Sequence, residues 1–162
     1  MAYNSTSWTS DALSKAGSSI TTTIIGASST TIKIFPHHFI TNDDSTALQF
    51  YAIEDDTSNY GIFVGNAACE LYAYIDIPTG YSAKKVVIYS SHDDIPVEVY
   101  SLNLTDGTIS GEISDSTLET NDTDKDLATP HQGANRTALF IKVALQSVSK
   151  LIYGGFVTIE QS

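Results

Sequence analysis

The sequence predicts an all-β protein, a jelly-roll-like antiparallel β-sandwich of about eight strands with an extended N-terminal arm. Three observations predict this fold class. Hydrophobic residues recur with a period of two in short segments, turn residues separate these segments, and helical periodicity is almost absent. Charged residues make up only 17% of the chain, and Ser and Thr take much of that polar share, which is typical of a Thr-rich β protein.

Residues 1–30 are expected to form the N-terminal arm, and residues 31–162 the β-sandwich domain. Ser, Thr, Gly and Ala dominate the first 30 residues, which therefore offer few side chains for a core. Trp8 is the exception, because a lone tryptophan in a polar terminus is often an anchor that packs against the protein body or a neighbour. We therefore expect Trp8 to contact a partner.

Period-two segments begin at Thr31 and continue to the C-terminus. The predicted strands are residues 31–35, 46–54, 60–65, 70–78, 84–91, 95–104, 137–146 and 151–161. Apolar residues alternate with Tyr72 and Tyr74 in one of them, and with Glu98 and Tyr100 in another. Eight strands in about 130 residues suit a jelly roll. An immunoglobulin-like sandwich is the main alternative, but its Cys…Trp…Cys signature is absent.

Residues 105–136 break this pattern and are expected to be a long, acidic, surface-exposed excursion between two strands. The segment has few apolar residues beyond Ile109, Ile113 and Leu118. Long loops of this kind usually carry function or contact a partner. We expect His131 and Arg136, near its end, to contribute to partner contacts.

The formal net charge of −11 limits the partners of the chain. Nucleic acid phosphates and anionic membrane surfaces repel such a protein, so neither is expected as a partner. A single cysteine, Cys69, excludes an internal disulfide and is expected to be a small buried hydrophobe. The chain opens without a secretion signal, and no apolar run is long enough to span a bilayer, so we expect it to be made in a cytoplasm.

One acidic segment has the spacing of a metal site. Asp122, Asp124 and Asp126 match the opening of a calcium loop, in which alternate carboxylates converge on one cation. The match then fails, because Leu127 and Gly133 stand where that loop needs Gly and Glu. A solvated acidic loop is therefore favoured over a calcium site.

Two histidine-containing segments are assigned to chain turns. Residues 92–94 (HDD) lie between two predicted strands and are expected to be a polar turn. Pro36 ends a strand, and His37 and His38 would point to opposite faces if the strand continued, so they would not converge on a zinc ion. One hypothesis remains, that His37 or His38 faces a neighbouring subunit and that protonation near pH 6 tunes assembly.

Signatures of catalysis are absent: there is no nucleophile elbow, Gly-rich phosphate loop or zinc-protease motif. We therefore expect a protein that is not an enzyme, with no catalytic residue, cofactor or metal. Tyr72, Tyr74 and Tyr100 are the stronger signal, because they lie opposite the apolar face of their strands. Three interpretations are open: a sugar-binding or protein-binding platform, a face buried between subunits, or side chains that line the core edge with hydroxyls outward.

Three segments resemble small virion proteins of tailed phages, especially phages of cyanobacteria and marine bacteria. They are IKIFPHHFITNDD (32–44), LYAYIDIPTGYSAKKVVIYSS (71–91) and LIYGGFVTI (151–159). The likeness covers about residues 30 to 160 in patches and consists of strand and turn motifs. Members of these families resemble capsid cement, or decoration, proteins.

This resemblance implies a jelly-roll or β-sandwich fold, assembly as a homotrimer and binding to the major capsid protein, whose neighbouring subunits are stapled together. It implies a place on the capsid surface of a virion made in the host cytoplasm, and it brings no catalytic residues. Two other classes stay open, a tail-fibre or receptor-binding tip and a carbohydrate-binding module. Binding of glycans or cells would favour these two, whereas trimerisation and affinity for empty capsids would favour a cement protein.

Overall fold

The computed structural model describes residues 29–41, 51–55, 60–65, 69–114, 118–145 and 147–162. The chain divides into two units, Met1–Thr30 and Thr31–Ser162, and the second unit is described below. Residues 1–28 of the expected arm, Trp8 among them, lie outside the described residues, whereas Ser29 and Thr30 belong to β1. The described elements are, in order, β1 (Ser29–Ile34), a turn of 3-10 helix η1 (Pro36–His38), β2 (Ile40–Thr41), β3 (Tyr51–Asp55), β4 (Tyr60–Val64), β5 (Glu70–Ile75), β6 (Tyr81–Ser90), β7 (Val97–Asn103), β8 (His131–Gln132), β9 (Thr137–Ala144) and β10 (Ile152–Gln161).

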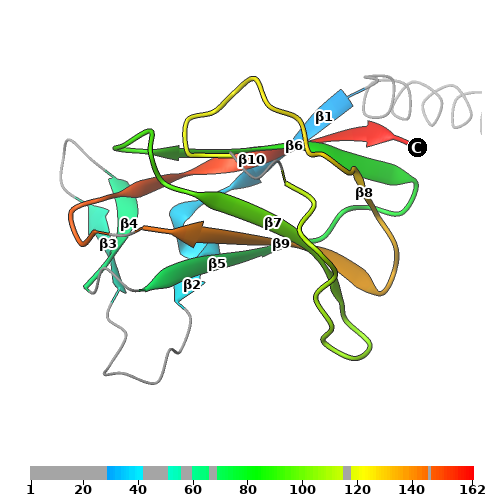
Figure 1. The fold of residues 1–162 in the computed structure, drawn as a ribbon, viewed down its shortest axis with the longest axis horizontal. Coiled ribbons are helices and arrows are strands. Elements are labelled where there is room, and N and C mark those ends of the chain that lie inside the picture. Colours follow the sequence, from blue (N-terminus) through cyan, green and yellow to red (C-terminus); the bar gives the residue numbers. More distant parts are fainter. Residues whose placement is uncertain (1–28, 42–50, 56–59, 66–68, 115–117, 146) are drawn as a thin grey trace, which may run out of the picture. The chain divides into compact units, whose positions relative to one another are not determined.

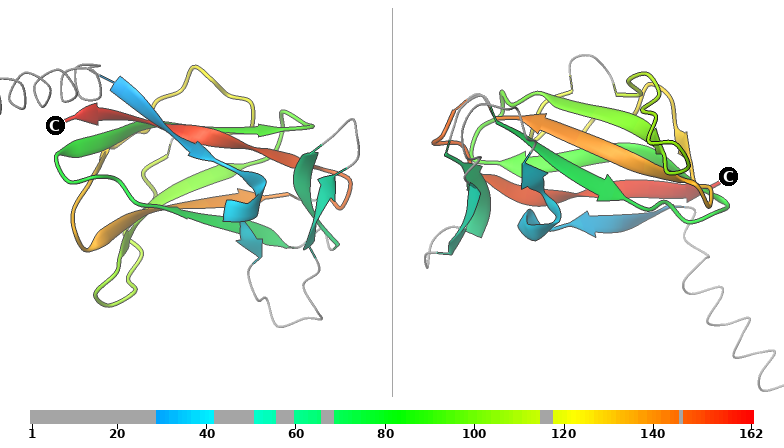
Figure 2. Two further views of the ribbon diagram at one scale, coloured as in Figure 1. Left: turned by 180° about the vertical axis from the view of Figure 1, so that it is seen from behind. Right: turned by 90° about the horizontal axis from the view of Figure 1, so that it is seen from below.

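Two antiparallel sheets form a sandwich, which confirms the predicted fold class (Figure 1). One sheet has the order β3-β4-β10-β6-β8, with β1 also paired to β10, and the other has the order β2-β5-β9-β7. Among the described strands, all but one of the connections between consecutive strands cross from one sheet to the other, the exception being the β3–β4 hairpin. Such crossing between two sheets is characteristic of jelly-roll connectivity. Figure 2 shows the same two layers from behind and from below.

The core lies between the sheets and consists of alternate residues of each strand, because successive side chains of a strand point to opposite faces. In β5, Leu71, Ala73 and Ile75 are buried, as expected from the period of two. In β9, Ile141 faces the same core. Cys69 is also buried in it, as predicted.

The segment after β7 covers the edge of that strand. Its backbone N–H and C=O groups pair with β7 and its start: Ser110 donates to the carbonyl of Ser101 at 2.9 Å, and Val97 donates to that of Leu118 at 2.9 Å. Leu118 and Leu127 are buried in the core. The prediction that residues 105–136 are a surface excursion is therefore wrong in part, because an edge strand needs backbone partners and this segment supplies them.

The histidine pair lies in η1 rather than in a continuing strand. Pro36 stands at the first position of this turn, where its missing N–H costs nothing. The rings of His37 and His38 lie 4.5 Å apart in an edge-to-face arrangement. Pro36 therefore ends the strand as predicted, and the opposite-face geometry of a continuing strand does not apply to the two histidines. Among the described residues, no helix is long and apolar enough to cross a bilayer.

Candidate binding surfaces

Three aromatic residues stand in one row on the outer face of the four-stranded sheet. Tyr74 of β5 is directly opposite Phe140 of β9, and Phe140 is directly opposite Tyr100 of β7. Directly opposite residues share a face, so the period of two that buries Leu71 and Ala73 turns these three rings outward. We call Tyr74, Phe140 and Tyr100 the aromatic row.

The rings of the aromatic row are packed against one another. The ring of Tyr74 is stacked on that of Phe140, with centroids 5.2 Å apart and an interplanar angle of 17°, and Tyr100 stacks on the other side at 5.8 Å. Tyr72 meets Phe140 edge-on at 5.0 Å. As a result Phe140 is only 5% exposed although it lies on an outer face, whereas Tyr74 is 48% exposed. Such pairs fix the orientation of each ring.

A charged bar of Glu70, Lys142 and Glu98 runs across the same three strands beside the row. The ammonium of Lys142 lies 2.8 Å from a carboxylate oxygen of Glu70 and 3.2 Å from one of Glu98. The hydroxyl of Tyr72 donates to Glu70 at 2.8 Å, and that of Tyr100 donates to Glu98 at 2.6 Å. The bar therefore holds two of the tyrosines by their hydroxyl groups.

The contacts of the bar shift three pKa values. The hydrogen bond to Glu98, with burial, raises the pKa of Tyr100 to about 12. Burial disfavours the charged form of Lys142, but its hydrogen bonds to Glu70 and Glu98 outweigh this effect and raise its pKa. Burial likewise disfavours the charged form of Glu98, but the hydrogen bonds from Tyr100 and Lys142 outweigh it and lower its pKa. All three groups therefore keep their neutral-pH charge states over a wider pH range.

A second aromatic surface lies on the outer face of the six-stranded sheet. Phe156 of β10 is opposite Val87 of β6, and its ring centroid lies 6.1 Å from that of Tyr89. Tyr89 and Tyr153 are 39% and 37% exposed. Neither hydroxyl has a hydrogen-bond partner among the described residues. We call Tyr89, Tyr153 and Phe156 the outer patch.

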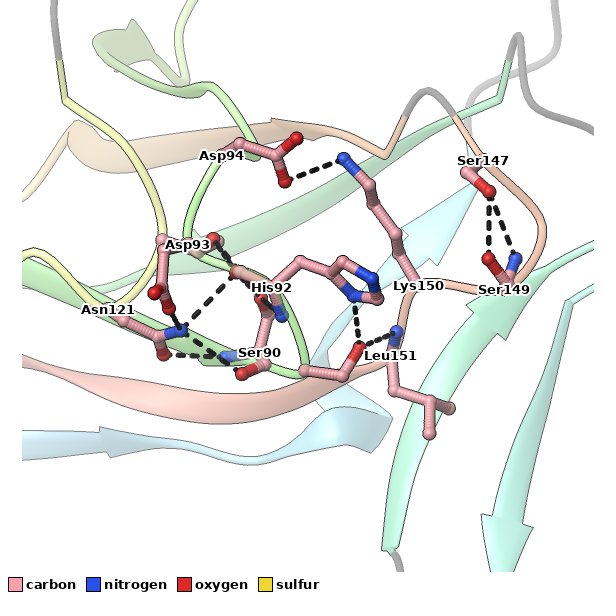
Figure 3. Close-up of polar contacts among 11 residues, drawn as sticks. Ser90, His92, Asp93, Asp94, Asn121, Ser147, Ser149, Lys150 and Leu151 are labelled. Atoms are coloured by element: carbon pink, nitrogen blue, oxygen red, sulfur yellow. Dashed lines mark hydrogen bonds and ion pairs between the residues drawn. The ribbon is translucent and has the colours of Figure 1, made fainter.

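The connection between β6 and β7 is fastened by Asn121 (Figure 3). Its amide oxygen accepts from the N–H of Ser90 at 3.0 Å, and its amide nitrogen donates to the carbonyls of Ser90 and His92 and to the carboxylate of Asp93. Asn121 has a φ of 62°, a left-handed conformation that asparagine tolerates better than most residues. Residues 92–94 thus form a fastened polar turn, as the sequence predicts.

One serine and one histidine in this turn are in contact. The hydroxyl of Ser91 lies 2.9 Å from Nδ1 of His92, and the same hydroxyl accepts from the N–H of Leu151 at 3.0 Å (Figure 3). Among the described residues, no carboxylate is hydrogen-bonded to the other ring nitrogen of His92. In the catalytic sets of many hydrolases a third group of that kind orients the base. The contact of Ser91 with Leu151 joins the turn to the start of β10.

The acidic loop is held by lysines. Asp122 pairs with Lys125 at 2.9 Å, and Asp126 lies 3.5 Å from Lys85. In the part of the chain that the structure describes, no three His, Cys, Asp or Glu side chains converge to hold a metal ion.

The structure brings together some of the predicted partner-binding residues and separates others. Tyr72, Tyr74 and Tyr100 share one face. Arg136 is exposed in a turn before β9, whereas His131 is 4% exposed and points into the sandwich, so its imidazole is not available to a partner. Phe140 was not among the predicted site residues, although its spacing of two from Lys142 in the same predicted strand places it on the outer face.

Comparison with known proteins gives no family assignment. No family model and no curated protein matches the chain. Among solved structures, it is similar to the CBM22-1 and GH10 modules of endo-1,4-β-D-xylanase 10B of Clostridium thermocellum, complexed with xylohexaose, with a TM-score of 0.39 and 13% sequence identity. The match covers 83% of this chain and 28% of that one, so this chain corresponds to less than a third of its length.

Proposed function

We propose that the protein is a non-enzymatic structural protein of a virus particle, of the capsid cement type, that forms a homotrimer and binds the major capsid protein. One observation carries the proposal: Tyr89 and Tyr153 in the outer patch are exposed, and their hydroxyls have no hydrogen-bond partner among the described residues. The segments that resemble phage virion proteins, 71–91 and 151–159, contain all three residues of the patch. A place on the capsid surface follows from this proposal.

The outer patch has the chemistry of a protein interface. Tyr89 and Tyr153 are each somewhat more than a third exposed, so burying the rest of each ring against a partner contributes about 2 kcal/mol per residue. Aromatic residues of this kind dominate the binding energy of interfaces. The net charge of −11 keeps such a protein away from packaged nucleic acid while it binds the shell.

Pelleting with empty capsid shells tests the proposal. We expect the full chain to be trimeric by light scattering and to pellet with shells of its major capsid protein. The double variant Tyr89→Ser/Tyr153→Ser should lose most of this binding, whereas Tyr74→Ser on the opposite sheet should bind as the wild type does. A monomeric wild type that stays in the supernatant would refute the proposal.

The N-terminal arm is proposed to order on a neighbouring subunit, with Trp8 as its anchor. Deleting residues 1–25 should then weaken shell binding more than trimer formation, because the arm gains its contacts only in the assembled shell. Full decoration of shells by the deletion variant would count against this role of the arm.

A second function, glycan recognition by a tail-fibre tip, a receptor-binding tip or a carbohydrate-binding module, is favoured by a different observation. The ring of Tyr74 is about half exposed and rigidly stacked on Phe140, and the charged bar lies beside it. Exposed rings next to polar groups are what sugars require.

A further inference from the structure

The aromatic row and the charged bar lie side by side on one face of a hydrogen-bonded sheet. The row spans three adjacent strands at one level, so it is about 10 Å long, or two inter-strand spacings. Tyr72 and Lys142 are directly opposite each other at the neighbouring level and join the row to the bar. A ligand that lies along the row meets aromatic rings on one side and hydrogen-bonding groups on the other.

The bar keeps hydrogen-bonding capacity that its own residues do not use. Glu98 contacts both Tyr100 and Lys142 through Oε2, and neither contact uses its Oε1. Lys142 contacts two carboxylates, whereas an ammonium has three N–H donors. The hydroxyl of Tyr74 has no partner among the described residues. The surface therefore offers an acceptor, a donor and a phenol that can act as either.

The charges of the bar select against anionic ligands and leave little for a cation to pair with. An anion that approaches the row meets two carboxylates on a chain of net charge −11. The same two carboxylates are already paired with the ammonium of Lys142, which a cationic ligand would have to displace. A neutral ligand whose groups both donate and accept hydrogen bonds avoids both costs, and it can satisfy Glu98 and Lys142 together.

We propose that this surface binds a neutral saccharide, with Tyr74 as the stacking platform and Glu98 and Lys142 as the hydrogen-bonding groups. The C–H face of a sugar ring packs on an aromatic ring, and its hydroxyls donate to the carboxylate and accept from the ammonium. A row about 10 Å long accommodates an oligosaccharide better than a single sugar. This inference rests on the glycan recognition proposed above as a second function and names its ligand class and its residues.

Titration of the full chain with defined oligosaccharides tests the site. The panel contains neutral gluco-, xylo-, manno- and N-acetylglucosamine oligomers, and an acidic set with uronic or sialic acids. Affinities are measured by calorimetry for the wild type, Tyr74→Ala, Glu98→Gln and the control Tyr60→Ala, which truncates a tyrosine of similar exposure on the other sheet. We expect a neutral oligomer to bind, Tyr74→Ala to weaken it about three- to tenfold, Glu98→Gln to weaken it as well, and Tyr60→Ala to leave it unchanged.

Three results would overturn the inference, and they separate it from the function on which it rests. Binding of acidic oligomers alone overturns the neutral ligand class but leaves glycan recognition standing. Binding that Tyr74→Ala does not weaken, with unaltered circular dichroism, overturns the site. Failure of the whole panel at millimolar concentration overturns the site and glycan recognition together, without affecting the proposal of shell binding.

Discussion

On the four-stranded sheet the hydroxyls of Tyr72 and Tyr100 donate to carboxylates, whereas on the six-stranded sheet those of Tyr89 and Tyr153 have no described partner. The first arrangement tethers its tyrosines to three paired charges and shields Phe140 beneath them. The second leaves rings exposed without such tethers. The same residue type thus gives a preorganised polar surface on one side and a surface suited to burial against a protein on the other.

The largest loss of stability is expected from a substitution at Gly154, where β1 lies against β10 in the six-stranded sheet. Gly154 has a φ of 114°, and a Cβ at this position would lie 2.3 Å from the carbonyl oxygen of Ile34. Gly154→Ala therefore both strains the backbone and forces β1 away, and it should lower the free energy of unfolding by more than about 3 kcal/mol. Urea denaturation measures this loss.

Gly111→Ala is the matched control for that substitution. A Cβ there would meet nothing within 4 Å, so the free energy of unfolding should change by less than about 0.5 kcal/mol. Equal stability of the two variants would mean that the backbone of β1 does not approach β10 closely at Gly154.

The next largest loss of stability is expected for the buried ring of Phe140, and about half that loss for the half-buried ring of Phe156. Phe140→Ala removes a ring that is 5% exposed and packed against three tyrosines, and it should cost about 3 kcal/mol. Phe156→Ala makes the same chemical change in the half-buried outer patch, and it should cost about half as much because less surface is lost from contact. Urea denaturation compares the two variants, and a larger loss for Phe156→Ala would mean that Phe156 is more tightly packed than Phe140.

Part of this comparison could be predicted from the sequence. Alternation placed Tyr72, Tyr74 and Tyr100 opposite the core, because a strand with one buried face has a period of two. The row itself could not be predicted, because it depends on β9 lying between β5 and β7 in a fixed register, and these pairings join residues more than 30 positions apart. Register between distant strands follows from packing of the whole core.

Two features have no signal in the hydrophobic periodicity. Pro36 predicts the end of a strand, but not the 3-10 turn η1 that begins there and brings the rings of His37 and His38 together. The low apolar content of residues 105–136 predicts a surface excursion, yet this segment supplies hydrogen bonds to the edge of β7. Neither a short 3-10 turn nor backbone pairing requires a recognisable side-chain pattern, so periodicity does not reveal them.

A smaller loss of stability is expected when the paired Lys142 of the four-stranded sheet is replaced, and a still smaller one for the exposed Lys33 of the six-stranded sheet. Lys142→Met leaves Glu70 and Glu98 without the ammonium between them, and it should cost about 1 to 2 kcal/mol at pH 7. The outward Lys33→Met on β1 is the control and should cost less than about 0.5 kcal/mol. Urea denaturation at pH 7 measures both changes.

The difference in free energy of unfolding between Lys142→Met and the wild type should disappear in acid. The folded-state pKa of Glu98 lies below its unfolded value, so its stabilising contribution is present above the unfolded pKa and is lost as pH falls through the folded pKa. The two free energies of unfolding should therefore converge when pH falls from about 5 to about 3. A gap that does not change with pH would show that Lys142 acts through packing of its alkyl chain.

The smallest effect comes from His131 in β8. His131 is directly opposite Ala83 on the core side of β6, and its Nε2 has no hydrogen-bond partner among the described residues. Burial alone lowers its pKa, with no contribution from a charged side chain. The folded state therefore favours the neutral ring, and stability should be complete above about pH 6.5 and fall as pH drops below that value.

Replacing the imidazole of His131 with an apolar side chain should remove this pH dependence of stability. Between pH 7 and pH 5 the wild type should lose about 1 kcal/mol relative to His131→Leu, which cannot be protonated, and thermal unfolding in matched buffers measures the difference. His37→Gln replaces an exposed histidine of η1 and is the control, which should lose stability in acid as the wild type does. An acid loss that persists in His131→Leu would contradict this account of His131.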